Sequence, residues 1–352
     1  MRIPHSASDV GDAEARAIAE AVARNRLGYG DASLALERAL LQRTCRSFGY
    51  AVLSGSHALA LAIAAADLAP GSLIALPVLT CTSVLQSVLN AGHVPVLVDI
   101  REDDLTLDVA CVPSNVALVI APHAYGAPVE VEALARRGLP WIEDCATSPA
   151  TRAAGRPAGS FGSLAVFSFG ATKYITGGSG GLVATDDPQM AERLRVVLDE
   201  RPRGGAFRHP ARGAMAGRLA SLNAAVALSQ LRRIDELRRR RHAIARRYLE
   251  AFPTLAPRPF DDAHGYYRVI LRVDEPAPVI ADNLQRHGID ARCSVNPWLD
   301  DHLGEPHPEF KGAQSWRERL LSLPIHPAMA ESDVDFVIDV VSESVAGASR
   351  SR

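Results

Sequence analysis

Short apolar runs recur along the chain between about residues 50 and 185, separated by turn residues and by stretches with helical spacing. Runs of this length predict buried strands, and near-continuous apolar strands are typical of a sheet that is covered on both faces. The seven predicted strands are Tyr50–Leu53, Leu73–Leu76, Val94–Val98, Val116–Ala121, Trp141–Ile142, Leu164–Phe169 and Leu182–Ala184.

Apolar residues spaced three and four apart predict helices between and around these runs. Ala58–Ala66 and Ser83–Ala91 separate successive strands, and Leu219–Phe252 forms one long helical stretch. Residues 8–45 predict further helices, broken around Gly28-Tyr29-Gly30. Strands that alternate with helices indicate an α/β fold. We therefore expect a large domain with a mainly parallel seven-stranded sheet flanked by helices.

Proline and aspartate gather after the long helical stretch, at residues 253–262, and predict a boundary there. Beyond it, Tyr267–Val273 predicts a strand, and Val279–His287 and Val334–Val345 predict helices. This pattern indicates a smaller C-terminal α+β domain. We expect the large domain, with its N-terminal helical segment, to span residues 1–240 and the small domain to span residues 241–352.

Charge and composition exclude several classes of protein. The net charge of −2 gives no reason to expect nucleic acid or a membrane surface, and we interpret the run Arg238–Arg241 as the solvated face of a helix. No apolar run approaches the roughly 20 residues that cross a bilayer, and the first residues do not resemble a signal peptide. The five cysteines are scattered without a CxxC pair, which favours reduced thiols in a cytoplasmic protein.

Lysine is rare in this sequence. Lys173 and Lys311 are the two lysines among 38 basic residues. A compositional bias towards arginine explains this rarity by itself. A lysine that survives such a bias is nevertheless a candidate for chemistry that arginine cannot perform, because arginine stays protonated and forms no imine.

The segment Ser54-Gly55-Ser56-His57 lies between a predicted strand and a predicted helix. A glycine turn at a helix start exposes backbone amides, which can bind a phosphate group. The alternative is a simple helix N-cap formed by Ser54 or Ser56. Taken alone, the segment favours the cap.

Two carboxylates, Glu143 and Asp144, end the predicted strand that begins at Trp141. The carboxyl ends of strands in an open α/β sheet face the ligand crevice. A carboxylate there can keep a pyridine nitrogen protonated, since negative charge favours the cationic form. The alternative is an aspartate that caps a helix.

The rare Lys173 follows the strand-end residue Ser168 and precedes a glycine-rich segment that ends at Gly181. The hydroxyls of Ser168 and Thr172 could bind phosphate oxygens, and glycines allow close backbone approach. The alternative is a surface lysine beside a flexible hairpin. The apolar and glycine surroundings favour the functional interpretation, and no competing Walker-type loop or early GxGxxG occurs.

The order of these three segments resembles that of fold-type I pyridoxal-phosphate (PLP) enzymes, and more narrowly of the DegT/StrS-type sugar aminotransferases. The resemblance covers most of the chain and includes the segments "LSGSHALALAIAAADLAPGSLIALPVLT", "APHAYGAPVEVEAL", "LPWIEDCATSPA", "GSFGSLAVFSFGATKYITGGSGGLVATDD" and "RLLSLPIHPAMAESDVDFVI".

The resemblance implies a role for each matching residue. Lys173 corresponds to the Schiff-base lysine, which also moves the proton between substrate and cofactor, and Asp144 corresponds to the partner of the pyridine nitrogen. Ser168 and the turn at Gly55 and Ser56 correspond to phosphate ligands. The remaining implied cofactor neighbours are His57, Cys81, Thr147 and Arg218. Arg218 falls in a loop that the family presents to the neighbouring subunit, so a homodimer with shared active sites is implied.

Three positions depart from the family pattern. Cys81 stands where an aromatic residue commonly stacks on the cofactor ring, and such stacking contributes about 1 kcal/mol. Thr147 stands where the family often has glutamine. Ala216-Gly217-Arg218 replaces a segment whose asparagine reaches the partner subunit's phosphate. These changes suggest a divergent member of the family.

The implied reaction is a PLP-dependent transamination with a ping-pong mechanism. By resemblance, the donor is glutamate or glutamine and the acceptor is a keto sugar, often nucleotide-linked, in a pathway for polysaccharide or a secondary metabolite. Alternatives are a non-sugar ketone, an elimination, or a non-catalytic regulator on the same fold. We also expect Trp298 and the segment around Asn296-Pro297 to line the substrate entrance.

Overall fold

The computed structural model describes residues 2–198, 217–304 and 309–349. The α-helices are α1 (Asp12–Ala23), α2 (Asp31–Thr44), α3 (Gly55–Ala65), α4 (Thr82–Asn90), α5 (Val131–Arg137), α6 (Pro188–Leu198), α7 (Ser221–Arg232), α8 (Ile234–Ala251), α9 (Ala277–Arg286), α10 (Leu299–Leu303), α11 (Lys311–Gln314) and α12 (Glu331–Ser349). The strands are β1 (Phe48–Val52), β2 (Leu73–Pro77), β3 (Val94–Val98), β4 (Leu118–Pro122), β5 (Trp141–Asp144), β6 (Arg152–Ala153), β7 (Arg156–Pro157), β8 (Leu164–Ser168), β9 (Gly181–Thr185), β10 (Val269–Arg272) and β11 (Leu320–Leu323).

A seven-stranded sheet forms the centre of the larger part of the molecule, in the order β1-β9-β8-β5-β4-β2-β3. β9 runs antiparallel to both of its neighbours, and the remaining pairs are parallel. The predicted α/β fold with a mainly parallel sheet is therefore confirmed. Each predicted strand of this sheet is present, with ends that differ by at most two residues.

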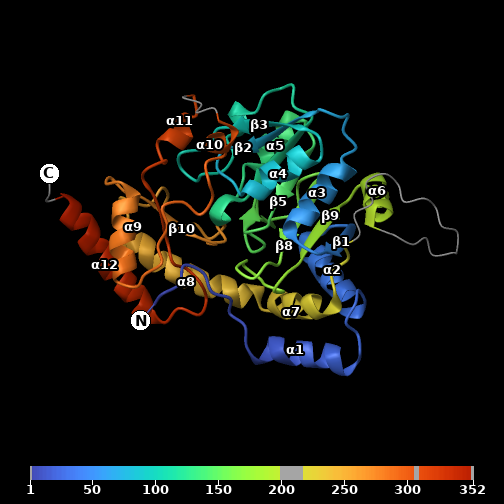
Figure 1. Cartoon of the computed structure of the whole chain (residues 1–352), viewed down its shortest axis with the longest axis horizontal. Coiled ribbons are helices and arrows are strands. Elements are labelled where there is room, and N and C mark those ends of the chain that lie inside the picture. The colour runs from blue at the N-terminus through green and yellow to red at the C-terminus, as the bar shows by residue number, and fades with distance from the viewer. Residues whose placement is uncertain (1, 199–216, 305–308, 350–352) are drawn as a thin grey trace.

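Both faces of the sheet are buried, because helices cover the side chains that point alternately to each face. Val166 packs in a cluster with side chains of α3, α4 and α6, whereas the next residue, Phe167, packs with side chains of α2 and α7. Successive side chains of a strand point to opposite faces, so a strand covered on both sides must be apolar throughout. Figure 1 shows the sheet between these two groups of helices.

The long helical stretch that the sequence predicted is two helices. Arg233 lies between α7 and α8 with φ −107° and ψ 18°, outside the helical range. The interpretation of Arg238–Arg241 as a solvated face is wrong for Arg241, which is buried against the rings of Tyr174 and Tyr267.

The C-terminal elements form a second apolar cluster, gathered on the left of Figure 1. β10 and β11 pair antiparallel, and side chains of α8, α9 and α12 pack beside them. The sequence pattern missed β11. The expected boundary between residues 240 and 241 falls inside α8, and the division into two domains stays a prediction. Within the described residues, no helix is long and apolar enough to cross a membrane.

Candidate active site

The carboxyl ends of parallel strands converge on one cavity. β1, β2, β4, β5 and β8 run in one direction, so the residues that follow them meet at the same edge of the sheet. A cavity of about 330 Å³ opens there, lined in part by Asp144 at the end of β5 and Ser168 at the end of β8. This volume lies within the usual range for small-molecule sites, and strand ends are where α/β sheets bind ligands.

The cavity brings together most of the residues that the sequence predicted for a cofactor site. Two predicted residues, His57 and Arg218, are not among its lining residues. The predicted residues that line it are Gly55, Ser56, Cys81, Asp144, Thr147, Ser168 and Lys173.

The turn before α3 combines both roles that its sequence allowed. The Ser54 hydroxyl accepts a hydrogen bond of 3.0 Å from the backbone amide of His57, so Ser54 is the helix N-cap. The amides of Gly55 and Ser56 belong to the first turn of α3, where no intrahelical carbonyl can pair with them. They are available to a ligand in the cavity.

Gly55 lies directly against Ser168. A Cβ on residue 55 would stand 2.6 Å from the Ser168 Cβ and 2.8 Å from its hydroxyl oxygen. Gly181 permits a similar approach from the other side, because a Cβ there would stand 2.4 Å from the carbonyl oxygen of Ser54. The glycines thus allow a hydroxyl and helix-start amides to share one small space, which suits an anion.

Asp144 is a buried carboxylate beside the lysine. It is 8% exposed, and its Oδ1 accepts a hydrogen bond of 2.9 Å from the amide of Ala146, which caps a turn rather than a helix. Burial raises the pKa of Asp144 above its ordinary value, while the charge of Lys173 opposes that rise. A cation placed against this carboxylate would favour its ionised form.

The neighbouring carboxylate, Glu143, points away from the cavity into a fully buried network. It accepts hydrogen bonds from the amides of Gly159 and Gly162 and contacts His123 Nε2 at 3.0 Å. The amide of Val129 donates to His123 Nδ1, so Nε2 carries the proton. Burial raises the pKa of Glu143, but these hydrogen bonds outweigh burial and hold it below its ordinary value. Glu143 anchors the strand end that carries Asp144.

Lys173 lies half-buried in the turn after β8, with its amide bonded to the carbonyl of Gly170 at 3.0 Å. Two contacts hold this turn. The Ser8 hydroxyl donates to the carbonyl of Ala171, and the Tyr267 hydroxyl donates to the carbonyl of Thr172 at 3.2 Å. The Thr172 side chain itself is exposed and is not among the residues that line the cavity.

Two of the three substituted positions, Cys81 and Thr147, line the cavity. Cys81 immediately precedes α4, is exposed, and accepts a hydrogen bond from the Ser83 hydroxyl at 3.2 Å. The Thr147 hydroxyl donates to the carbonyl of His123 at 3.3 Å. The cavity lining therefore has a thiol and a hydroxyl at these two positions.

His57 and Arg218 lie together outside this cavity. A Cβ on Gly217 would stand 2.1 Å from the His57 ring, so the two segments touch. The Arg218 guanidinium lies over the rings of Tyr29 and Tyr50, at 5.0 and 4.8 Å from their centroids. Ala216, the third substituted position, lies outside the described residues.

Sequence reasoning did not single out two aromatic residues that line the cavity. Tyr125 and Tyr267 contribute rings to the cavity from segments after β4 and before β10. Asn296 lines the cavity as expected, whereas Trp298 is buried in a neighbouring apolar cluster. Only the fold brings these rings beside Lys173, because their own segments have no local pattern that marks a site.

The residues present fit PLP. The phosphate needs an anion site, and the helix-start amides and Ser168 could supply one at the place where a Cβ on Gly55 would leave no room. The ring needs a carboxylate for its nitrogen and an amine for its aldehyde, and Asp144 and Lys173 line the same cavity. When bound, the cofactor supplies an electron sink for the reacting carbon.

Known proteins resemble this chain over nearly its whole length. The Bacillus subtilis (strain 168) spore coat polysaccharide biosynthesis protein SpsC is 29% identical, with 98% of each chain covered. The aminotransferase TlmJ from Streptoalloteichus hindustanus is 26% identical with a TM-score of 0.91, covering 99% of this chain and 100% of that one. DesV from S. venezuelae is 29% identical with a TM-score of 0.86, covering 94% of this chain and 93% of that one.

The sequence profile of the DegT/DnrJ/EryC1/StrS aminotransferase family matches residues 8–342. This match spans almost all of the 352 residues, including every segment that forms the cavity. The resemblance that the motifs suggested is confirmed. The chain belongs to the DegT/DnrJ/EryC1/StrS aminotransferase family and is a PLP-dependent transaminase.

Proposed function

We propose that this transaminase moves an amino group from glutamate or glutamine to a keto sugar, which is nucleotide-linked, by a ping-pong mechanism. The observation that carries the proposal is the single cavity on which Lys173, Asp144 and Ser168 all open. The sugar acceptor is supported by the likeness to SpsC, whose name places it in polysaccharide biosynthesis.

Each of these residues then has a defined role. Lys173 would hold the cofactor through its Nζ, and its free amine would act as the general base that accepts the proton from the donor's α-carbon. Asp144 keeps the proton on the ring nitrogen. The Ser168 hydroxyl and the amides of Gly55 and Ser56 bind the phosphate.

The lining of the cavity suits the neutral, hydroxyl-bearing sugar ring of the acceptor. Apart from Lys173 and Asp144, no Asp, Glu, His, Lys or Arg of the described chain lines it. Thr80, Ser83 and Asn296 offer neutral donors and acceptors of hydrogen bonds. Sugar hydroxyls need such partners, whereas a charged group inside the cavity would need a counter-ion. The diphosphate of a nucleotide-linked acceptor would therefore lie outside this cavity.

Two wider proposals accompany this one. We propose a homodimer in which Arg218 serves the partner's site, because its side chain lies outside the cavity of its own chain. We also propose a cytoplasmic location, since all five cysteines are free thiols.

Half-reactions test the proposal. Glutamate or glutamine, added without acceptor, should abolish the visible absorbance of the lysine-linked cofactor, and a keto sugar should restore it. Restoration by non-sugar ketones alone would contradict the sugar acceptor. Release of ammonia or a dehydrated sugar without restoration of the band would indicate elimination instead.

A further inference from the structure

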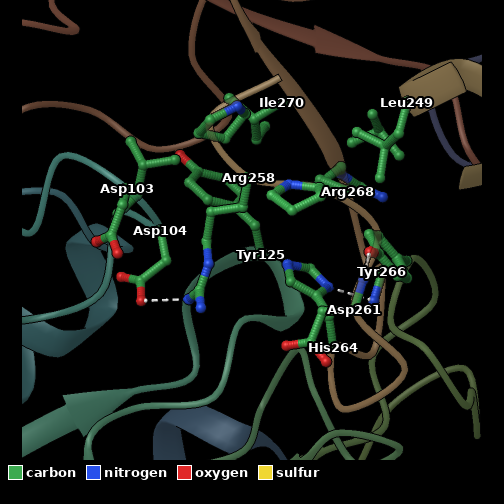
Figure 2. A pocket seen from close by; sticks show the side chains of 14 residues that line it. Asp103, Asp104, Tyr125, Leu249, Arg258, Asp261, His264, Tyr266, Arg268 and Ile270 are labelled. Carbon is green, nitrogen blue, oxygen red and sulfur yellow. Dashed lines mark hydrogen bonds and ion pairs between the residues drawn. The ribbon is translucent and has the colours of Figure 1, made fainter. Parts of the chain in front are cut away.

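Two cavities of the molecule share one wall. Tyr125 lines the active-site cavity and also a second cavity of about 50 Å³, shown in Figure 2. Tyr125 is the one described residue that lines both. Two adjacent residues line different cavities: Tyr266 lines the second cavity, and Tyr267 lines the active-site cavity. Tyr125 and this segment therefore form a partition.

The backbone of Tyr125 is held in an unfavourable conformation. Its φ is 55°, in the left-handed region that bulky side chains rarely adopt. The carbonyl of Tyr125 accepts a hydrogen bond of 3.0 Å from the amide of Arg268, and the carbonyl of Gly126 accepts one of 2.8 Å from Gly265. Strain that neighbouring contacts maintain is often associated with a functional task.

Gly126 shows how closely the two segments approach. Its φ is 107°, and a Cβ there would stand 2.7 Å from the amide nitrogen of Tyr266. The Thr151 hydroxyl also donates to the carbonyl of Gly126 at 2.8 Å. The turn therefore has little freedom to swing aside, which constrains the backbone that carries the Tyr125 ring.

The Tyr125 ring is buried and uncharged. Tyr125 is 5% exposed. Burial raises the pKa of its hydroxyl well above the ordinary value, so the phenol stays protonated at neutral pH. The ring fills its place as a neutral surface and brings no charge to the active-site cavity.

The second cavity has compensated charges. Asp104 pairs with Arg258 at 3.1 Å, the contact dashed in Figure 2, and Asp103 pairs with Arg101 at 2.8 Å. Asp261 accepts a hydrogen bond of 2.8 Å from the amide of Ala263. Arg268 also lines this cavity and donates to the carbonyl of Tyr267 at 2.9 Å, so the guanidiniums of Arg101, Arg258 and Arg268 match the three aspartates in number. Such groups can hydrogen-bond to hydroxyls and leave little net charge to attract an ion. A neutral hydroxylated group suits this cavity.

We propose that Tyr125 is a specificity-determining residue that closes the acceptor site and rejects ketones with an additional neutral, hydroxylated substituent. The inference rests on the proposed sugar amination and deepens it. The residue acts by exclusion, because its ring stands where the longer substituent would pass into the second cavity.

Two keto sugars that differ by one such substituent test the proposal with the holoenzyme. Tyr125→Gly removes the ring and suits the left-handed backbone. We expect it to raise the ratio of kcat/KM for the larger over the smaller ketone at least about tenfold, within the range that pocket contacts give. Tyr125→Phe keeps the ring and should leave the ratio within about twofold of wild type.

The proposal would be overturned if Tyr125→Gly retains cofactor absorbance and cooperative melting but leaves the ratio unchanged. It would also be overturned if Tyr125→Gly and Tyr125→Phe change the ratio equally. If Tyr125→Gly does not fold, Tyr125→Asn replaces it, because asparagine also tolerates this backbone. If wild type aminates neither ketone, the proposed function fails separately. Affinities of wild type and Tyr125→Gly for the same two ketones, measured by calorimetry, then test the exclusion by Tyr125. The variant should raise the ratio of affinities for the larger over the smaller ketone at least about tenfold. Equal ratios in the two proteins would contradict the proposal.

Discussion

Gly55 lies so close to Ser168 that a Cβ on residue 55 would stand 2.6 Å from the Ser168 Cβ. This contact joins the start of α3 to the end of β8. The two elements are more than 100 positions apart in the sequence, and together they line the space proposed for the phosphate. The proposed phosphate site therefore depends on the absence of one side chain as much as on the presence of a hydroxyl.

Gly55→Ala should weaken PLP binding at least about tenfold and destabilise the fold by about 1–3 kcal/mol, because the added methyl must displace β8 or α3. Titration of the apoenzyme with PLP and urea unfolding measure both effects. Gly28→Ala is the control, since nothing lies within 4 Å of a Cβ at residue 28. Equal affinities for the two variants would contradict this account of the phosphate site.

Asp144→Asn should lower transamination at least about a hundredfold while the cofactor still attaches to the chain. The amide has the shape of the carboxylate but carries no charge to hold a proton on the ring nitrogen. Losses of this order are typical when one preorganised polar group is removed. Single-turnover rates measure the loss, and full activity would remove Asp144 from the mechanism.

Glu143→Gln should cost about 3–5 kcal/mol at pH 7, because the substitution breaks a buried charge network. The folded pKa of Glu143 lies below its ordinary 4.5. Its contribution to stability is thus complete above about pH 4.5 and is lost as the pH falls through the lower folded value. The difference in urea midpoint between wild type and variant should shrink on acidification.

The exposed Glu192 supplies the control for this pH series. It pairs with Arg195 on the surface, and such pairs contribute little to stability. Glu192→Gln should leave the urea midpoint nearly unchanged. A Glu143→Gln difference that stayed constant from pH 7 to acid would show that the charge of Glu143 does not act as described.

Cys81→Phe should tighten PLP binding about fivefold, if the new ring stacks on the cofactor and contributes about 1 kcal/mol. Cys81 is exposed at the cavity, so a larger side chain has room to enter it. Cys111→Phe, at another exposed cysteine that does not line the cavity, should leave the affinity unchanged. Weaker binding by Cys81→Phe would mean that residue 81 does not face the ring.

Local patterns in the sequence predicted the sheet and several of the residues that line its cavity. Apolar runs determine strands, and Asp144 and Ser168 end two of those strands, so their convergence follows from a parallel sheet. Lys173 stood out because the chain has so few lysines.

Contacts between distant segments could not be predicted in this way. Arg241 sits in a run of arginines that resembles a solvated helix face, yet tertiary packing buries it against Tyr174 and Tyr267. Tyr125 carries no periodic signal, and its place between two cavities depends on the segment that precedes β10. β11 is defined by its antiparallel pairing with β10, which lies in a distant segment, and no local pattern shows that pairing.

The attachment of the cofactor to Lys173 is the central claim, and the two lysines of the chain allow a direct test. Borohydride reduction of the PLP-loaded protein, followed by peptide mass mapping, should place the cofactor on Lys173. Wild type and Lys311→Ala should both absorb at roughly 410–430 nm, as expected of a lysine-linked cofactor, and Lys173→Ala should not. Cofactor mass on Lys311, or a band retained in Lys173→Ala, would contradict the account.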